Sequence, residues 1–262
     1  MQFCSLSSGS SGNCQFIEYK DTKILIDAGH SGKKITALLQ EIGQDIRDID
    51  AIFVSHEHVD HAKGVGVLAK KYGLKVFATM ETIMSMEPIT KPIAHHQVYA
   101  FENGKGFDFK DLHILPMRSF HDCTNGSMFV IDGDVKVSVA TDTGHLSTEH
   151  LQHMAGSKLY YLEANHDLDM LMQGSYPWSL KTRIASTHGH LSNDSAAKVL
   201  EQLLTRQGEI VMLSHLSKDN NTDTLAIDTV RNHLLRASLH DGVDYTVEVS
   251  PRDSVKFHHL GR

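Results

Sequence analysis

Short runs of β-branched and aromatic residues alternate with amphipathic helical patterns along the whole chain of 262 residues. This alternation is typical of α/β proteins, in which helices cover the faces of β-sheets. We expect strands at 13–19, 23–26, 51–55, 75–78, 112–117, 128–132, 135–140, 158–162, 209–213 and 244–249. We expect helices at 33–42, 62–72, 192–206 and 222–236. No repeat, low-complexity tract or long linker divides the sequence, so we expect a single domain, residues 1–262.

Polar side chains follow several of these strands at the point where each strand ends. The positions are Asp27, His56, His121, Asp142, Glu163 and His215. In layered α/β folds, ligands bind outside the carboxyl ends of the strands. We therefore expect these six side chains to converge on one rim, although they are far apart in the sequence.

The segment Ser55-His56-Glu57-His58-Val59-Asp60-His61 places three imidazoles among carboxylates directly after an expected strand. A turn at this point lets His56 and His58 face one metal ion while Asp60 and His61 face a second. Imidazole and carboxylate ligands together suit zinc, manganese or iron. The segment therefore predicts a site for two divalent metal ions, with zinc or manganese preferred to iron.

The His-x-His-x-Asp-His pattern of this segment resembles the signature of the metallo-β-lactamase superfamily. The resemblance implies a four-layer αββα sandwich and a hydrolase with two metal ions. It implies two ligand sets that share one aspartate: His56, His58, His121 and Asp142 for the first ion, and Asp60, His61, Asp142 and His215 for the second. A hydroxide that bridges two such ions is a strong nucleophile near neutral pH.

Roles near the metal site can also be assigned to three individual residues. By the resemblance, Asp27 is the buried aspartate that orients the cluster from behind the ligands, and Asp60 is expected to serve catalysis as well as metal binding. Cys123 is an alternative ligand near His121, but we expect it to be a small buried side chain instead.

Two later segments indicate the class of substrate. Leu162-Glu163-Ala164-Asn165-His166-Asp167 and Thr187-His188-Gly189-His190-Leu191-Ser192-Asn193 resemble the acidic residue and the histidine that ribonuclease Z and its relatives add to the metal site. The resemblance implies that His190 protonates the leaving oxygen and that Glu163 orients it. His188 and His166 are the alternatives for this acid.

A Ser/Gly-rich segment, residues 7–13, lies near the start of the chain. Its backbone N–H groups and hydroxyls can cradle a phosphate, although a plain tight turn has the same composition. The candidate phosphate-binding residues are Ser8, Ser10, Ser11 and Asn13 of this segment, together with His188 and Arg183.

An aromatic pair, Tyr176 and Trp178, precedes Lys181 and Arg183. Aromatic side chains beside cations can stack on a nucleic-acid base and pair with the backbone phosphates. Packing of Trp178 in the core is an equally good interpretation, because it is the only tryptophan.

Taken together, the motifs of residues 6–221 resemble the YycJ/WalJ branch of the superfamily. The resemblance implies an exonuclease that acts on DNA, in preference to RNA, from 5′ ends. An acyl hydrolase of the glyoxalase II or lactonase type, with the same metal ions, is the alternative. The net charge of −7 argues against binding by bulk positive potential, but metal cations can supply positive charge at the reacting phosphate.

The sequence also bears on where the protein works. No apolar run approaches the ~18 residues that span a bilayer, and the first residues resemble no secretory signal. Three cysteines, an odd number, suggest no disulfide framework. We therefore expect a cytoplasmic protein with no membrane partner.

Overall fold

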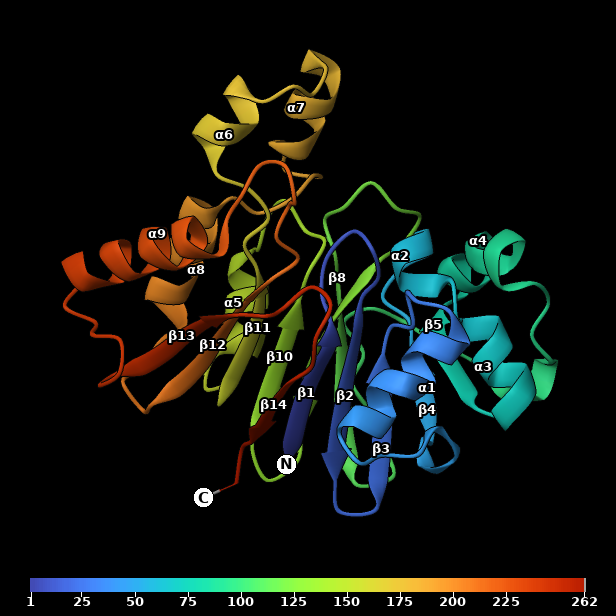
Figure 1. Cartoon of the computed structure of the whole chain (residues 1–262). Coiled ribbons are helices and arrows are strands. Elements are labelled where there is room, and N and C mark those ends of the chain that lie inside the picture. The colour runs from blue at the N-terminus through green and yellow to red at the C-terminus, as the bar shows by residue number, and fades with distance from the viewer. Residues whose placement is uncertain (262) are drawn as a thin grey trace.

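A computed structural model describes residues 1–261 and contains two seven-stranded mixed sheets that pack face to face (Figure 1). The first sheet has the strand order β14 (Lys256–His259), β1 (Gln2–Ser7), β2 (Cys14–Tyr19), β3 (Thr22–Ile26), β4 (Ala51–Phe53), β5 (Lys75–Thr79) and β6 (Val98–Phe101). The second has the order β13 (Tyr245–Val249), β12 (Glu209–Ser214), β11 (Leu159–Glu163), β10 (Lys136–Ala140), β9 (Ser127–Asp132), β8 (Leu112–Arg118) and β7 (Phe107–Phe109).

Helices cover the outer face of each sheet, which gives four layers (Figure 1). The first sheet carries α1 (Gly32–Glu41), α3 (Val65–Tyr72) and α4 (Met80–Thr90); the second carries α5 (Thr148–Met154), α8 (Asn193–Leu203) and α9 (Asp223–Arg236). One apolar core fills the space between the sheets, and a further core lies under each helical layer. The predicted αββα sandwich is confirmed.

Parallel pairing explains why the polar strand ends meet. Strands β3, β4 and β5 run parallel in the first sheet, and β10, β11 and β12 run parallel in the second. The carboxyl ends of each set lie at one edge of its sheet. The contact between His61, which follows β4, and Asp142, which follows β10, shows that both edges lie at the same end of the sandwich. The short helix α2 (Val59–Ala62) begins at this end, directly after the His-rich segment.

The predicted elements are found, but some elements were not predicted. Each of the ten expected strands overlaps an observed strand, and the helix expected at 62–72 is divided into α2 and α3. The ten expected strands do not include β1 or the short edge strands β6, β7 and β14. The sequence also did not indicate four helices: α4, which contains Pro88, α5, α6 (Leu168–Gln173) and α7 (Trp178–Ile184).

Helices α6 and α7 cover neither sheet; they project from the end of the sandwich where the strands of the second sheet carry their polar residues (Figure 1). Within residues 1–261 no helix is both long enough and apolar enough to cross a bilayer.

Candidate metal centre

Three residues of the site follow strand ends that turn sharply. Asp27, Asp142 and His215 follow β3, β10 and β12, and their φ angles are 62°, 53° and 54°. A positive φ is uncommon for residues other than glycine and carries a conformational cost. Such strain is found preferentially at functional sites, where the surrounding structure holds it in place.

Asp27 is buried and holds the His-rich turn through three hydrogen bonds. Its Oδ1 accepts from the backbone N–H of Ser55 at 2.7 Å, and its Oδ2 accepts from Oγ of Ser55 and from Nδ1 of His61, each at 2.7 Å. The bond to Nδ1 fixes the orientation of the His61 ring and leaves Nε2 to face the cavity. Ser55 was not predicted to contribute; its place immediately before the motif was the only signal.

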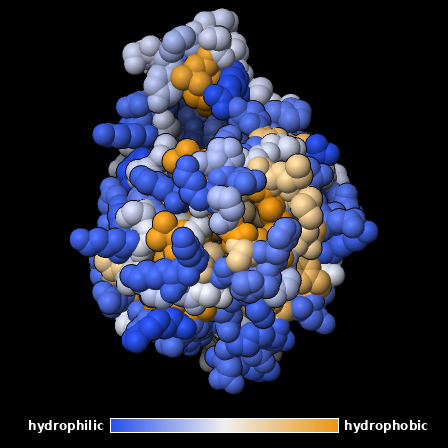
Figure 2. Space-filling model, turned by 90° about the vertical axis from the view of Figure 1, so that its right-hand side faces the viewer, coloured by the Kyte–Doolittle hydropathy of each residue, from blue (hydrophilic) through white to orange (hydrophobic). Residues whose placement is uncertain are grey.

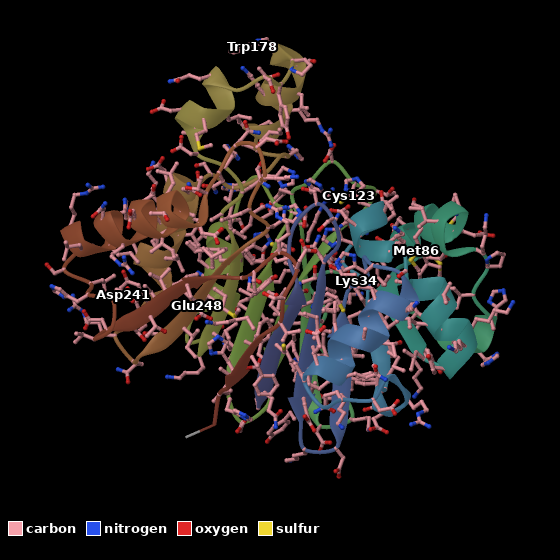
Figure 3. The ribbon with its side chains drawn as sticks, in the orientation of Figure 1. Lys34, Met86, Cys123, Trp178, Asp241 and Glu248 are labelled. Carbon is pink, nitrogen blue, oxygen red and sulfur yellow. The ribbon has the colours of Figure 1, made fainter. Side chains whose placement is uncertain are left out.

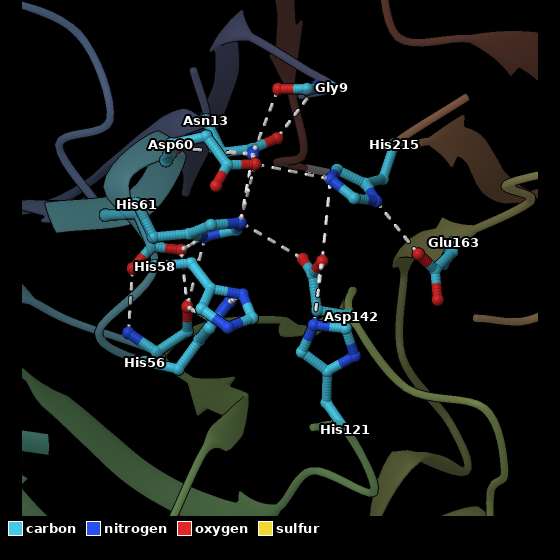
Figure 4. Close-up of polar contacts among 12 residues, drawn as sticks. Gly9, Asn13, His56, His58, Asp60, His61, His121, Asp142, Glu163 and His215 are labelled. Carbon is cyan, nitrogen blue, oxygen red and sulfur yellow. Dashed lines mark hydrogen bonds and ion pairs between the residues drawn. The ribbon is translucent and has the colours of Figure 1, made fainter. Parts of the chain in front are cut away.

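The first ligand group consists of His56, His58 and His121, whose ring nitrogens lie within 4.8 Å of one another. His121 comes from the loop after β8, and its Nδ1 donates to the carbonyl of Gly189 at 3.0 Å, which leaves Nε2 for the cavity. Three imidazoles from two loops therefore point at one position (Figure 4).

The second group consists of Asp60, His61 and His215, and Asp142 lies between the two groups (Figure 4). Oδ2 of Asp142 is 3.2 Å from Nε2 of His61. Oδ1 of Asp142 is 3.5 Å from Nε2 of His215 and 3.9 Å from Nε2 of His121. The seven predicted ligands are thus brought together, and the position of Asp142 is that of a shared ligand.

The donor set fits divalent cations. Oδ2 of Asp142 and Nε2 of His215 are buried and have no hydrogen-bond partner. Buried polar atoms are nearly always satisfied, so such orphaned atoms need another partner. A set of imidazole and carboxylate donors suits zinc, manganese or iron.

The carboxylates of Asp27, Asp60 and Asp142 dominate the electrostatics at the site. Burial opposes a charge on His61, but Asp142, Asp27 and Asp60 raise its pKa well above the usual range. Burial likewise opposes a charge on His215, and Asp142 is the main cause that raises its pKa to about 10. The site therefore attracts positive charge, as a metal site must.

Glu163 is fully buried at the end of β11 and contacts two histidines. Its Oε1 accepts from Nδ1 of His190 at 2.7 Å and from Nδ1 of His215 at 2.9 Å. Its Oε2 accepts from the backbone N–H groups of Thr143 and Leu191, both at 3.1 Å. The sequence predicted the contact with His190 but not the one with His215.

The three histidines considered as the acid occupy different places. His190 lines the cavity beside the ligands. His188 is exposed and stands against Phe120, outside the residues that line the cavity. His166 is fully buried, neither ring nitrogen has a partner, and burial lowers its pKa to about 4. Of the three, only His190 lines the cavity.

The Ser/Gly-rich segment lies against the second ligand group. Oγ of Ser8 is buried and accepts from the backbone N–H of His215 at 2.9 Å. Oδ1 of Asn13 accepts from the backbone N–H of Gly9 at 2.8 Å, and its Nδ2 lies 3.0 Å from Nε2 of His61. Ser10 lines the cavity, whereas Ser11 is exposed and does not. Ser8 and Asn13 thus support the ligands from the side of the loop.

The cavity above the ligands has a volume of about 170 Å³. Its outer wall is formed by side chains that were not predicted as ligands: Ser10, Asn165, Tyr176, Arg183, Ile184 and Ser217. Arg183 forms an ion pair with Asp122, the residue next to His121. Cys123 belongs to none of the ligand groups, and burial raises its pKa to about 12.

Comparison with known proteins agrees with this geometry. A family model described as "Beta-lactamase superfamily domain" matches residues 22–216. The exodeoxyribonuclease WalJ of Streptococcus pneumoniae is 42% identical over 254 residues, which cover 95% of this chain and 94% of that protein. The exodeoxyribonuclease YycJ of Bacillus anthracis is 37% identical over 227 residues, which cover 86% of each chain.

Solved structures support the fold. The crystal structure of the metallo-β-lactamase fold protein YhfI from Bacillus subtilis has a TM-score of 0.70 at 14% identity and covers 98% of both chains. The resemblance inferred from the sequence is therefore confirmed: the chain belongs to the metallo-β-lactamase superfamily and, within it, to the branch of the WalJ and YycJ proteins.

Proposed function

We propose that this protein is a metal-dependent hydrolase that cleaves the phosphodiester bonds of DNA as an exonuclease, acting from 5′ ends. The observation that carries the proposal is the hydrogen bond between Glu163 and His190, 2.7 Å long, directly beside the metal-ligand groups. Cleavage of a phosphodiester needs a proton for the departing oxygen, and this pair can supply it. The relatives WalJ and YycJ, which match nearly the whole chain, are named exodeoxyribonucleases.

Two divalent ions, zinc or manganese in preference to iron, would be held by the two ligand groups. The first set is His56, His58, His121 and Asp142, and the second is Asp60, His61, Asp142 and His215. When bound, the metals lower the pKa of water and neutralise charge on the phosphate. Both sheets supply ligands to this one cavity, so we treat residues 1–262 as one functional domain.

His190 is the proposed acid. Burial opposes a charge on its ring, but Glu163 raises the pKa of His190 above its usual value. This shift favours the protonated imidazole, the form that a general acid needs. Since Nδ1 is engaged by Glu163, Nε2 is the atom that remains to donate a proton to the leaving oxygen.

Two of the predicted phosphate-binding residues line the cavity and can contact a phosphate directly, Ser10 through its hydroxyl and Arg183 through its guanidinium. Ser8 and Asn13 act indirectly, through His215 and His61. The cavity has a volume of about 170 Å³ and is open to solvent, so it can receive the reacting phosphate of a longer strand. The rest of a nucleic-acid substrate would lie outside, on the surface around the opening.

The ranking of substrates tests this proposal. Metal-loaded protein is assayed for kcat/KM with a DNA oligonucleotide, a thioester of the glyoxalase II type and a lactone. We expect the oligonucleotide to be the best substrate by a wide margin, because an acyl group makes no use of the Glu163–His190 pair. If a thioester or lactone is the best substrate, the protein is an acyl hydrolase and not a nuclease, and the proposed metal ligands remain unchanged.

A further inference from the structure

Helices α6 and α7 form a projection, residues 167–185 (Figure 1), and Tyr176, Arg183 and Ile184 of this projection line the metal cavity. Its base is fastened to the body of the protein. The backbone N–H of Asp167 donates to the carbonyl of Asn220 at 2.9 Å, and the Tyr176 hydroxyl donates to Asp219 at 2.8 Å. The projection is therefore a fixed part of the site's surroundings, although it contributes to neither helical layer.

The projection exposes large apolar side chains. Trp178 is 69% exposed, and Leu168 and Met172 are 40% and 39% exposed. Trp178 therefore does not pack in the core, and it lies at the outer end of the projection (Figure 3). In the space-filling view, hydrophobic atoms appear on the projection among hydrophilic ones, above a hollow that separates it from the body (Figure 2). A tryptophan can bury 150–250 Å² in a contact, and here most of that surface is left uncovered.

The opposite end of α7 belongs to the metal cavity. Arg183 and Ile184 line the cavity, as does Tyr176 just before the helix. Arg183 follows Trp178 by five positions, which is about 7.5 Å along a helix axis. Bases that are stacked as in a duplex are about 3.4 Å apart, so this distance corresponds to about two nucleotides.

The projection has too few accessible cations to bind a nucleic acid by electrostatic attraction alone. Lys181 is buried and its Nζ donates to the carbonyl of Met172 at 2.7 Å, so it joins α7 to α6 and does not face a substrate. Arg183 is the cation of this segment that reaches the cavity. The whole chain has a net charge of −7. Base stacking on an aromatic side chain needs no positive charge.

We infer that Trp178 is a base-stacking residue for the nucleic-acid strand where it leaves the metal cavity, about two nucleotides from the cleaved bond. This inference rests on the proposed nuclease function. Arg183 exchanges its ion pair with Asp122 for the backbone phosphate between the cleaved bond and the stacked base. The projection thereby binds the part of the substrate that lies outside the cavity.

The sequence provides a direct probe, because Trp178 is the only tryptophan and its fluorescence reports on this position alone. The zinc-loaded full chain is titrated with a single-stranded DNA oligonucleotide whose phosphorothioate linkages resist hydrolysis. Stacking of a base on the indole ring quenches its emission. We expect saturable quenching by this oligonucleotide, and none by an abasic sugar–phosphate oligomer of the same length.

Variants extend the test to substrates that are cleaved. Trp178→Ala should weaken binding of a labelled oligonucleotide, followed by anisotropy, by about 5- to 150-fold, the range expected for one stacked base. The KM for DNA should rise while kcat is retained, and Trp178→Phe should recover most of the affinity. Val243→Ala is the matched control, since Val243 is 79% exposed and belongs to the loop before β13, away from the projection.

Two outcomes separate this inference from the function on which it rests. If the wild-type protein cleaves DNA, but DNA leaves the tryptophan emission unchanged and Trp178→Ala binds like the wild type, the stacking role is wrong and the nuclease stands. If the wild-type protein cleaves no unmodified oligonucleotide, the proposed function itself fails.

Discussion

Oε1 of Glu163 accepts a hydrogen bond from Nδ1 of His190 at 2.7 Å, and the carboxylate is fully buried. The same oxygen also lies 2.9 Å from Nδ1 of His215, so one atom orients both the proposed acid and a proposed metal ligand. Glu163 therefore contacts both the proposed acid and the proposed metal site. The sequence indicated only the first of these two roles.

The substitution Glu163→Gln tests this double role. An amide cannot accept from all four of its present donors, so both histidines should lose their orientation. We expect turnover to fall and metal affinity to fall by about 10–100-fold, the usual effect of removing a group that orients a ligand. Metal titration and steady-state kinetics measure the two effects separately.

The matched control is Glu209→Gln. Glu209 is also a buried carboxylate that accepts from backbone N–H groups, but it lies at the start of β12, at the opposite end of the strand from His215. If Glu163→Gln binds metal as tightly as the wild type and only its turnover is reduced, the contact between Glu163 and His215 does not contribute to metal binding.

The substitution His190→Ala separates the proposed acid from the ligands. Both metals should remain bound, and turnover of DNA should fall by about 10²–10⁴-fold, the typical contribution of a general acid. Much of the loss should disappear with a nitrophenyl phosphodiester, because nitrophenolate leaves without a proton. The control is His240→Ala, because His240 is exposed and does not line the cavity. Loss of metal from His190→Ala would make His190 a ligand.

Metal stoichiometry follows from the two ligand groups. Elemental analysis of manganese- or zinc-saturated protein should approach two ions per chain, because Asp142 lies within reach of both groups. His58→Ala should lower the metal content and abolish activity together. A saturating value of one ion per wild-type chain would be incompatible with a dinuclear site.

The stability of the metal-free protein should depend on acid pH through Glu163. Burial opposes its charge, but His190 and its hydrogen bonds lower the pKa of Glu163 to about 2. Because the folded pKa is lower than the ordinary value, this stabilisation is present above about pH 4.5 and is lost as the pH falls toward 2. In urea unfolding between pH 6 and pH 3, the free-energy difference between the wild type and Glu163→Gln should shrink as the pH falls. A difference that stays constant with pH would show that the carboxylate is not stabilised in its charged form.

Much of the fold and the site could be predicted, because both depend on patterns that a sequence displays. Strand periodicity located the ends of β3, β10 and β12, and with them Asp27, Asp142 and His215. Contacts between segments that are distant in the sequence depend on tertiary packing, and no pattern in the sequence indicates them. The carbonyl of Gly189 that holds His121 is one example, and the support that Ser8 gives to the backbone of His215 is another.

The least predictable part was the projection formed by α6 and α7. Both helices are too short to show a helical period, with six and seven residues. Trp178 also shows why composition alone was insufficient: tryptophan is highly buried on average, yet Trp178 is exposed. Only the tertiary structure places it at the surface, beyond the cavity.

The account is tested most directly by the digestion of end-labelled DNA. Metal-loaded protein is incubated with one duplex labelled at its 5′ ends and with the same duplex labelled at its 3′ ends, with and without a chelator. We predict that the 5′ label is released at once in short products, while the 3′-labelled strands shorten progressively, and that the chelator stops both. Intact DNA in the presence of bound metal, or cleavage that continues when the metal has been removed, would contradict the account.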